Sequence, residues 1–316
     1  MGDTSADAGS RTLWAIACAP SVPGHEREAA SVVDDRDTSG NHIRGKVIVV
    51  TGAGSGFGRV TSQLAGSLGA SIVATDIDGD AAAATAESIV AGGGQAEGVA
   101  ADVVQKADMD HVAQVAVDRF GAIDVLVNNA GVMPLAFFAD HERAWEAWDR
   151  CVDINLKGVV HGIAAVYDRM IEQGRGHIVN VSSIYGNRGT AGSGVYSATK
   201  AAVVVISDAL RVEAQGRIKV TVVRPTGVPG TNLASSVVNF EASVGIAGQN
   251  AQRFGEHAQQ RSQGTLPAEA LDPDHVAYWA LKPEELAAQI VGVINTPWGV
   301  NISDITVRAT GEDYIL

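Results

Sequence analysis

The sequence has little cysteine and no long apolar runs. Only two cysteines, Cys18 and Cys151, occur in 316 residues, which excludes a disulfide framework and suits a reducing cytoplasm. No apolar run reaches the ~20 residues of a membrane helix. The eight histidines are scattered, and none has a partner at the spacing of a zinc ligand pair. A secreted disulfide scaffold, a membrane protein and a metal centre are therefore disfavoured.

Basic residues are also in short supply. The chain carries 23 lysines and arginines against 36 acidic residues, a formal net charge of −13. No basic cluster is present that would follow a phosphate backbone, which argues against a nucleic-acid partner. A small-molecule partner is expected instead.

Hydrophobic residues make up 46% of the chain, and short apolar strands alternate with helical stretches. This alternation predicts one doubly wound α/β domain over residues 45–316, with roughly seven parallel strands between helices. Residues 1–44, rich in Ala, Ser, Asp and Gly, are expected to form a flexible extension or a segment that wraps a neighbouring subunit.

A strand, a glycine turn and a helix begin this domain. The β-branched run Lys46–Val50 leads through Thr51–Gly58 into an apolar-periodic stretch. Gly52 and Gly56 permit a tight turn and close backbone approach, and Gly58 lets helix and strand pack closely. Such a Rossmann-type turn offers backbone N–H groups to a pyrophosphate at the helix N-terminus.

The next strand ends in a carboxylate. Ser71–Thr75 reads as a strand and is followed by Asp76, which could accept hydrogen bonds from an adenosine ribose and would repel a 2′-phosphate. Ser55 and Ile77 provide no cation beside it. This arrangement favours NAD over NADP.

Tyr196 and Lys200 have the spacing of an acid–base pair. On one helix, residues i and i+4 share a face. A phenol with a pKa near ~10 is a poor base at neutral pH unless a cation lies close. An ammonium at ~4 Å would contribute about 4 kcal/mol, enough to lower that pKa by ~3 before desolvation opposes it. Ser183 precedes this pair and can bind the same substrate oxygen.

From Gly45 to the C-terminus the chain resembles the short-chain dehydrogenase/reductase family. The resemblance rests on Thr51–Gly58, Asp102-Val103, Asn128–Gly131, Asn155 and the Ser183, Tyr196 and Lys200 set. It implies that Ser183 binds the substrate oxygen, that Tyr196 exchanges its proton, and that Lys200 binds the nicotinamide ribose. Asn155 would hold a helix bend and a water of the proton relay.

The motifs and the resemblance together give the expected NAD contacts. These are Gly52, Ser55, Gly56, Phe57, Gly58, Asp76, Ile77, Asp102, Val103, Asn129, Ala130, Gly131, Tyr196, Lys200, Pro225, Thr226, Gly227, Val228 and Thr231. One segment departs from the family pattern. Thr226 stands where a glycine is usual, and Thr231 comes one residue late for a contact with the nicotinamide carboxamide, so the alternative that this segment only shapes a loop stays open.

The expected activity is reversible hydride transfer between NAD(H) and a small, mostly apolar secondary alcohol or ketone, alicyclic or aromatic. A lid is expected over residues 232–273, and Met133, Ile184, Tyr185 and Asn187 are candidate pocket walls. Alternatives are an NADP-linked or acyl-thioester reductase of the same family, or a dinucleotide-binding regulator without turnover. Surplus apolar residues in 156–170 and 201–210 predict a homodimer or homotetramer.

Overall fold

The computed structural model describes residues 40–316, so most of the expected N-terminal extension lies outside the described residues. Its last residues belong to the folded domain. Ile43 is fully buried, and the Asn41 Nδ2 amide donates to the Leu68 carbonyl at 3.0 Å. The flexible or wrapping role of the preceding residues stays a prediction.

A seven-stranded, wholly parallel sheet forms the centre of the domain, in the order β3-β2-β1-β4-β5-β6-β7. This confirms the expected doubly wound fold. The strands are β1 Val47–Thr51, β2 Ser71–Asp76, β3 Gln95–Ala100, β4 Val125–Asn128, β5 Gly176–Val181, β6 Ile218–Pro225 and β7 Asp304–Val307.

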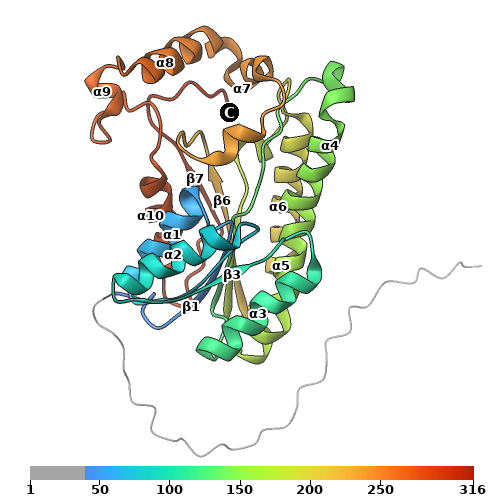
Figure 1. Ribbon diagram of the computed structural model, residues 1–316, viewed down its shortest axis with the longest axis vertical. Coiled ribbons are helices and arrows are strands. Elements are labelled where there is room, and N and C mark those ends of the chain that lie inside the picture. The colour runs from blue at the N-terminus through green and yellow to red at the C-terminus, as the bar shows by residue number, and fades with distance from the viewer. Residues whose placement is uncertain (1–39) are drawn as a thin grey trace, which may run out of the picture. The chain divides into compact units, whose positions relative to one another are not determined.

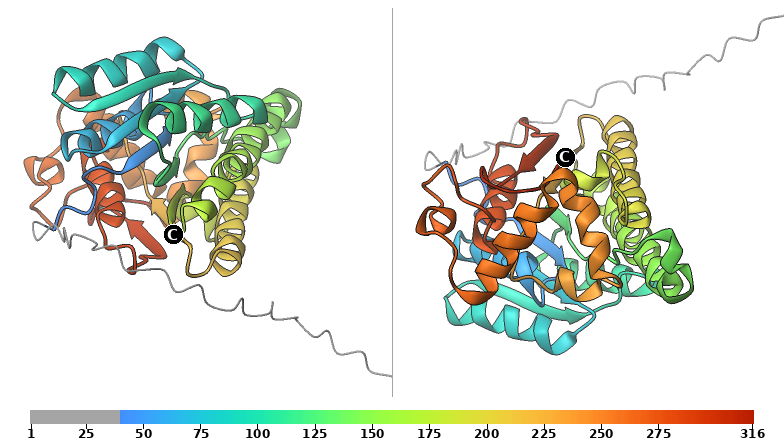
Figure 2. Two further views of the ribbon diagram at one scale, coloured as in Figure 1. Left: turned by 90° about the horizontal axis from the view of Figure 1, so that it is seen from below. Right: turned by 90° about the horizontal axis from the view of Figure 1, so that it is seen from above.

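Helices cover both faces of the sheet (Figures 1 and 2). The longer helices are α1 Gly56–Ser67, α2 Gly79–Ala91, α3 Lys106–Phe120, α4 His141–Val152, α5 Gly158–Glu172, α6 Gly194–Glu213, α8 Ala251–Gln263 and α10 Pro283–Ile294. The apolar cluster on one face joins α1 and α10 to the sheet, and the cluster on the other face joins α3, α5 and α6. No helix within residues 40–316 is long and apolar enough to span a bilayer.

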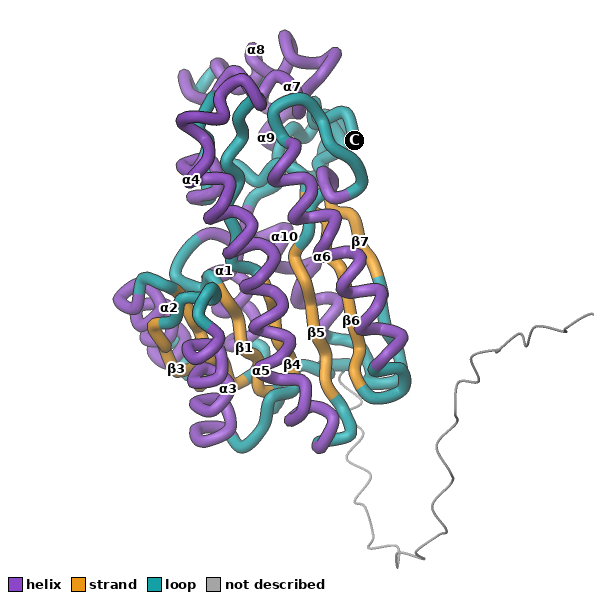
Figure 3. The backbone as a smooth tube through the Cα atoms, turned by 90° about the vertical axis from the view of Figure 1, so that its right-hand side faces the viewer, coloured by secondary structure: helices purple, strands orange, loops and turns teal. Residues whose placement is uncertain are grey.

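The order of the strands creates a crevice. Strand order reverses between β1 and β4, and ligands of open α/β sheets bind at the carboxyl ends of strands beside such a point. Because every strand runs the same way, the segments that follow β1, β2, β4, β5 and β6 all emerge at this edge (Figure 3).

The segment expected as a lid, residues 232–273, is mostly helical and stands above this edge (Figure 1). Its short elements are η4 Asn232–Ser236, η5 Phe240–Ser243, α7 Val244–Ala247, η6 Gly248–Asn250 and α9 Ala268–Leu271, with α8 between the last two. Two further single turns, η1 Phe138–Asp140 and η3 Ile184–Gly186, lie near the site. We keep the name lid for residues 232–273.

Candidate active site

The glycine turn has the conformation that its sequence demands. Gly52 and Gly56 have φ values of 65° and 53°, in the left-handed region that side chains disfavour. A Cβ on Gly58 would lie 2.2 Å from the Gly52 carbonyl oxygen, so helix α1 approaches the turn more closely than any side chain permits. Ser55, at the N-cap of α1, makes no side-chain capping bond and lines the adjoining cleft.

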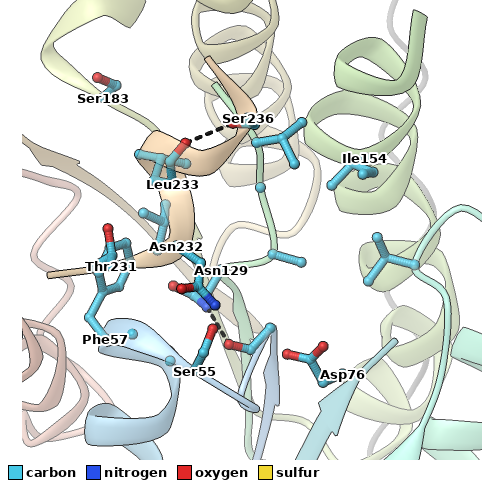
Figure 4. A pocket seen from close by; sticks show the side chains of 18 of the residues that line it. Ser55, Phe57, Asp76, Asn129, Ile154, Ser183, Thr231, Asn232, Leu233 and Ser236 are labelled. Carbon is cyan, nitrogen blue, oxygen red and sulfur yellow. Dashed lines mark hydrogen bonds between the residues drawn. The ribbon is translucent and has the colours of Figure 1, made fainter. Parts of the chain in front are cut away.

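Asp76 ends β2 beside this turn. Its Oδ2 accepts a hydrogen bond from the Gly54 N–H at 2.9 Å and its Oδ1 accepts one from the Asp78 N–H at 3.1 Å. The carboxylate is therefore fixed against the glycine turn and faces the same cleft (Figure 4).

The turn after β4 is bonded to the turn after β1. Asn129 Nδ2 donates to the carbonyls of Thr51 at 2.7 Å and Gly52 at 3.2 Å, and the Thr51 hydroxyl accepts from the backbone N–H groups of Asn129 and Ala130, each at 3.0 Å. The Asn129 Oδ1 is buried without a partner. Because Asn129 lines the cleft, this unpaired oxygen could accept a hydrogen bond from a ligand.

Helix α6 presents Tyr196 and Lys200 one turn apart, and Ser183 caps η3 next to them. All three side chains are at least nine-tenths buried. Ser182, the neighbour of Ser183, donates through Oγ to the Lys200 carbonyl at 2.8 Å, which ties this loop to the helix. The predicted set thus meets at one place.

Burial dominates the proton affinities of this set. It raises the pKa of the Tyr196 phenol to about 12, against a hydrogen bond with Ser183 that lowers it, and it lowers the pKa of Lys200 to about 8. The Lys200 Nζ donates to the Val181 carbonyl at 2.9 Å. The net shift of the tyrosine pKa is upward because desolvation of the phenol is the largest effect, and Lys200 is not among the groups that lower it here.

Asn155 lies behind the set, in the π-helical turn η2 Asp153–Lys157 that joins α4 to α5. Its amide accepts from the Val132 N–H and donates to the Val132 carbonyl, both at 2.9 Å, and it also donates to the Thr199 hydroxyl at 3.2 Å. A π-helical turn interrupts the α-helical pattern around Asn155, where the resemblance implies a bend, and such turns often mark functional sites. The Asn155 side chain itself does not line the cleft.

A cleft of about 320 Å³ connects these parts. The expected dinucleotide contacts line it, except Gly227, and so does Ser183. Lining residues that sequence reasoning missed come from α4, the π-helical turn, β5 and its end, the start of the lid and two turns. They are Arg150, Ile154, Val181, Ser182, Asn232, Leu233, Ser235, Ser236, Ala101 and Val132. Figure 4 shows Leu233 and Ser236 above the cleft.

The candidate pocket walls do not line this cleft. Ile184 and Tyr185 are buried, and the Tyr185 hydroxyl donates to the Ile246 carbonyl at 2.6 Å. Asn187 accepts from the Arg224 guanidinium at 2.8 Å, and the Met133 N–H donates to Ser236 Oγ at 2.8 Å. Ile184, Tyr185 and Met133 belong instead to an apolar cluster around the Tyr196 ring.

A parallel sheet with a glycine turn and a Ser, Tyr and Lys set at one crevice is the arrangement of an α/β oxidoreductase. Comparison with known proteins gives the family. Residues 46–242 match the family described as short chain dehydrogenase, and the chain belongs to it. The family resemblance found in the sequence is thus confirmed.

The relatives agree with this assignment. An uncharacterized oxidoreductase of Listeria monocytogenes is 28% identical over 275 residues, which cover 86% of this chain and 99% of the relative. Among solved structures, a short chain dehydrogenase/reductase from Burkholderia phymatum in complex with NAD is 28% identical with a TM-score of 0.66, covering 84% of this chain and 89% of its own. A metagenomic short-chain oxidoreductase in complex with NADP is 27% identical with a TM-score of 0.64, covering 85% and 98%.

Proposed function

We propose that this protein is an NAD-dependent alcohol dehydrogenase/carbonyl reductase that acts on a small, mostly apolar secondary alcohol or ketone. The observation that carries the proposal is a single cleft with Asp76 at one end and Ser183, Tyr196 and Lys200 at the other. Both carboxylate oxygens of Asp76 are fixed by backbone N–H groups, so a 2′-phosphate placed beside them would be repelled by the carboxylate.

The residues fit a dinucleotide. At Gly56 the backbone itself lines the cleft, because glycine has no side chain. A Cβ on Gly56 would lie only 3.4 Å from Thr231 Cγ2, on the facing segment of the cleft. The first turn of α1 offers free N–H groups to a pyrophosphate, and Asn129 Oδ1 offers an unpaired acceptor. A bound nicotinamide dinucleotide would supply the hydride acceptor or donor.

The chain's own groups would handle the proton and the substrate oxygen. With a pKa of about 12, Tyr196 holds its proton at neutral pH and is ready to donate it to a ketone oxygen. Ser183, whose hydroxyl lowers the pKa of the same phenol, would hold that oxygen in place. Lys200, with a pKa of about 8, is mostly charged at pH 7 and would bind ribose hydroxyls once it leaves the Val181 carbonyl.

An apolar substrate suits the surroundings of Tyr196. Its ring packs in a cluster with Leu135, Ile184 and Tyr185. Among the described residues that line the cleft, Lys200 and Arg150 are the cations, and they come from different helices. Such surroundings favour an alicyclic or aromatic ketone over a phosphorylated substrate.

The decisive experiment compares wild type with Tyr196→Phe. Initial rates of ketone reduction and alcohol oxidation are measured with NAD(H) and with NADP(H), and dinucleotide binding is followed by tryptophan fluorescence. We expect kcat to fall by ~10²–10⁴-fold in the variant while NADH still binds. Tyr167→Phe is the matched control, because Tyr167 lies on α5 in a separate apolar cluster. Equal rates in all three proteins would overturn the catalytic role, and faster turnover with NADPH would overturn the NAD preference.

We also propose that the enzyme is a homodimer or homotetramer that pairs through α5 and α6. Val160 on α5 is 43% exposed and Val205 on α6 is 68% exposed, which are large values for apolar side chains on long helices. Light scattering of wild type and of a Val205→Glu variant tests this. A smaller mass for the variant is expected, and an unchanged mass would contradict the pairing.

A further inference from the structure

The last nine residues, 308–316, form a C-terminal tail that leaves β7 and runs beneath the lid. Figure 1 places the C-terminus next to α7, above the carboxyl edge of the sheet. The Gly311 N–H donates to the Tyr278 carbonyl at 2.8 Å, and the Ile315 N–H reaches the Ile246 carbonyl in α7 at 3.5 Å. The tail is thus bonded to the segments before and after α8 and α9.

Asp313 anchors the tail to the lid. Its carboxylate is fully buried and is met by Arg253 and His257 from α8 and by the Trp279 indole N–H, with 2.8 Å to both His257 Nδ1 and Trp279 Nε1. Asn250 donates to the Asp313 carbonyl at 3.1 Å. Burial raises the pKa of this carboxyl, but the three donors together hold it below its ordinary value, so Asp313 stays charged at neutral pH.

The tail fits against two glycines that admit no side chain. A Cβ on Gly227, in the segment that follows β6, would lie 1.8 Å from the Tyr314 hydroxyl oxygen. A Cβ on Gly248, in the lid, would lie 2.6 Å from the Ile315 Cδ1 atom. The tail therefore lies in direct contact with both the lid and the segment that carries Pro225, Thr226 and Val228 into the cleft.

Two tail side chains reach the catalytic surroundings. Tyr314 and Leu316 pack on the apolar cluster that contains Tyr196 and Tyr185. The Tyr314 and Tyr185 rings meet edge to face at 6.3 Å between centroids. The pKa of Tyr185 is raised by burial first, and then by the nearby Tyr314, Glu312 and Tyr196 side chains.

Glu312 adds a link to the residue that departs from the family pattern. Burial raises the pKa of its carboxyl, and the Thr226 hydroxyl acts in the opposite direction. Thr226 Oγ1 and Glu312 Oε2 are both buried, and neither atom has a hydrogen-bond partner. The threonine at position 226 is therefore a neighbour of Glu312, although no hydrogen bond joins the two side chains.

We propose that the C-terminal tail is the specificity wall of the substrate pocket, with Leu316 and Tyr314 limiting substrate size beside Tyr196 and with Asp313 holding the lid over that wall. The size limit rests on the proposed ketone reductase activity. Asp313 is a positioning residue, whereas Tyr314 and Leu316 lie outside the dinucleotide cleft and border the apolar cluster that contains Tyr196.

The test compares Leu316→Ala with Ile315→Ala. Leu316 packs on the apolar cluster that contains Tyr196, whereas Ile315 packs on Gly248 and lines a separate hollow with Arg188 and Val244. The kcat/KM values for cyclohexanone and for the bulkier bicyclic decalone are measured with saturating NADH. A few methylene groups in an apolar pocket change kcat/KM by about 10–200-fold, so Leu316→Ala should raise the decalone to cyclohexanone ratio by about 10-fold or more.

Ile315→Ala should leave this ratio unchanged, because its side chain packs on Gly248 and does not belong to the cluster that contains Tyr196. An equal shift in both variants, or none in either, overturns the wall. A general loss of folding would lower kcat/KM for both ketones alike and would leave their ratio unchanged, so the ratio separates a wall from a purely structural role.

The anchor has its own test that needs no turnover. Asp313→Asn keeps the shape of the side chain and removes the charge that holds Arg253 and His257. Trypsin cleavage of α8 at Arg253 and Arg261 should then become at least ~10-fold faster, because cleavage follows the population of the opened lid. Unchanged cleavage overturns the anchor. A wild type that reduces neither ketone while Asp313→Asn opens α8 would refute the proposed substrate class and the size limit, but would keep the anchor.

Discussion

Replacement of Gly58 by alanine should distort the glycine turn and destabilise the protein, even though alanine is the better helix former. The new Cβ would lie 2.2 Å from the Gly52 carbonyl oxygen and 2.4 Å from Asn129 Nδ2. Neither neighbour can yield alone, because Asn129 Nδ2 bonds the carbonyls of both Thr51 and Gly52. The methyl group would therefore push apart the turn after β1 and the turn after β4.

The magnitude follows from the contacts that are lost. Two hydrogen bonds are worth about 0.5–1.5 kcal/mol each. Overpacking adds about 1–3 kcal/mol, and the gain in helix propensity returns about 1 kcal/mol. The free energy of unfolding should fall by about 1–5 kcal/mol, which lowers Tm by several degrees in a domain of this size.

The assay is thermal unfolding followed by circular dichroism, with and without NAD. Gly292→Ala in α10 is the matched control, because a Cβ there meets nothing within 4 Å, and it should be neutral or stabilising by up to about 1 kcal/mol. NAD should raise the Tm of wild type and of the control more than that of Gly58→Ala. If Gly58→Ala has the same Tm as the control, and NAD raises both Tm values equally, the close approach of helix α1 to the glycine turn is incorrect.

Three further predictions concern buried polar groups. Burial raises the pKa of the Cys151 thiol to about 11, so a Cys18→Ser variant should react with a thiol reagent at pH 7 only after unfolding. Burial lowers the pKa of Lys46 and Lys219 from 10.5 to about 8, so the folded protein loses these protons first, and urea midpoints should rise between pH 8 and 10.5. That rise should be smaller in Lys46→Met, and an equal rise would contradict the shift. Asn180 accepts from Asn128 at 2.8 Å and donates to Ser207 at 2.9 Å, so Asn180→Ala should cost about 2–4 kcal/mol in urea unfolding and exceed the cost of Ser207→Ala; the reverse order would refute this network.

The sequence was sufficient for features that depend on near neighbours in the chain. The glycine turn from Thr51 to Gly58 and the pair Tyr196 and Lys200 are local patterns, and the structure shows both at the expected places. Parallel strand order then brought separate motifs to one edge, since each follows the carboxyl end of a strand. The seven-stranded fold could be predicted for the same reason.

The proton affinities could not be predicted from spacing. The i, i+4 relation places the Lys200 ammonium near the Tyr196 phenol, but it does not reveal that both are almost completely buried. Desolvation depends on residues from several distant elements, and here it moves both pKa values toward the neutral forms.

The contacts of the candidate pocket walls could not be predicted for a related reason. Tyr185 follows Ser183 closely in the chain, yet its hydroxyl donates to the Ile246 carbonyl in the lid, 61 residues away. Met133 is bonded to Ser236, 103 residues away. Which side of a loop faces the cleft is decided by such long-range partners, and no local pattern reports them.

Helix α8 has no buried residue along its thirteen positions. Arg253, Phe254 and His257 hold it to Asp313, Trp279 and Tyr314, and the remaining positions carry little structural constraint. Among descendants of one ancestor, most of this helix can therefore accumulate substitutions without cost to folding, while changes at those three positions must be matched by changes at the chain end. In lineages that diverge in substrate, substitutions in α8 should be correlated with substitutions at the C-terminus, while the glycine turn stays nearly constant.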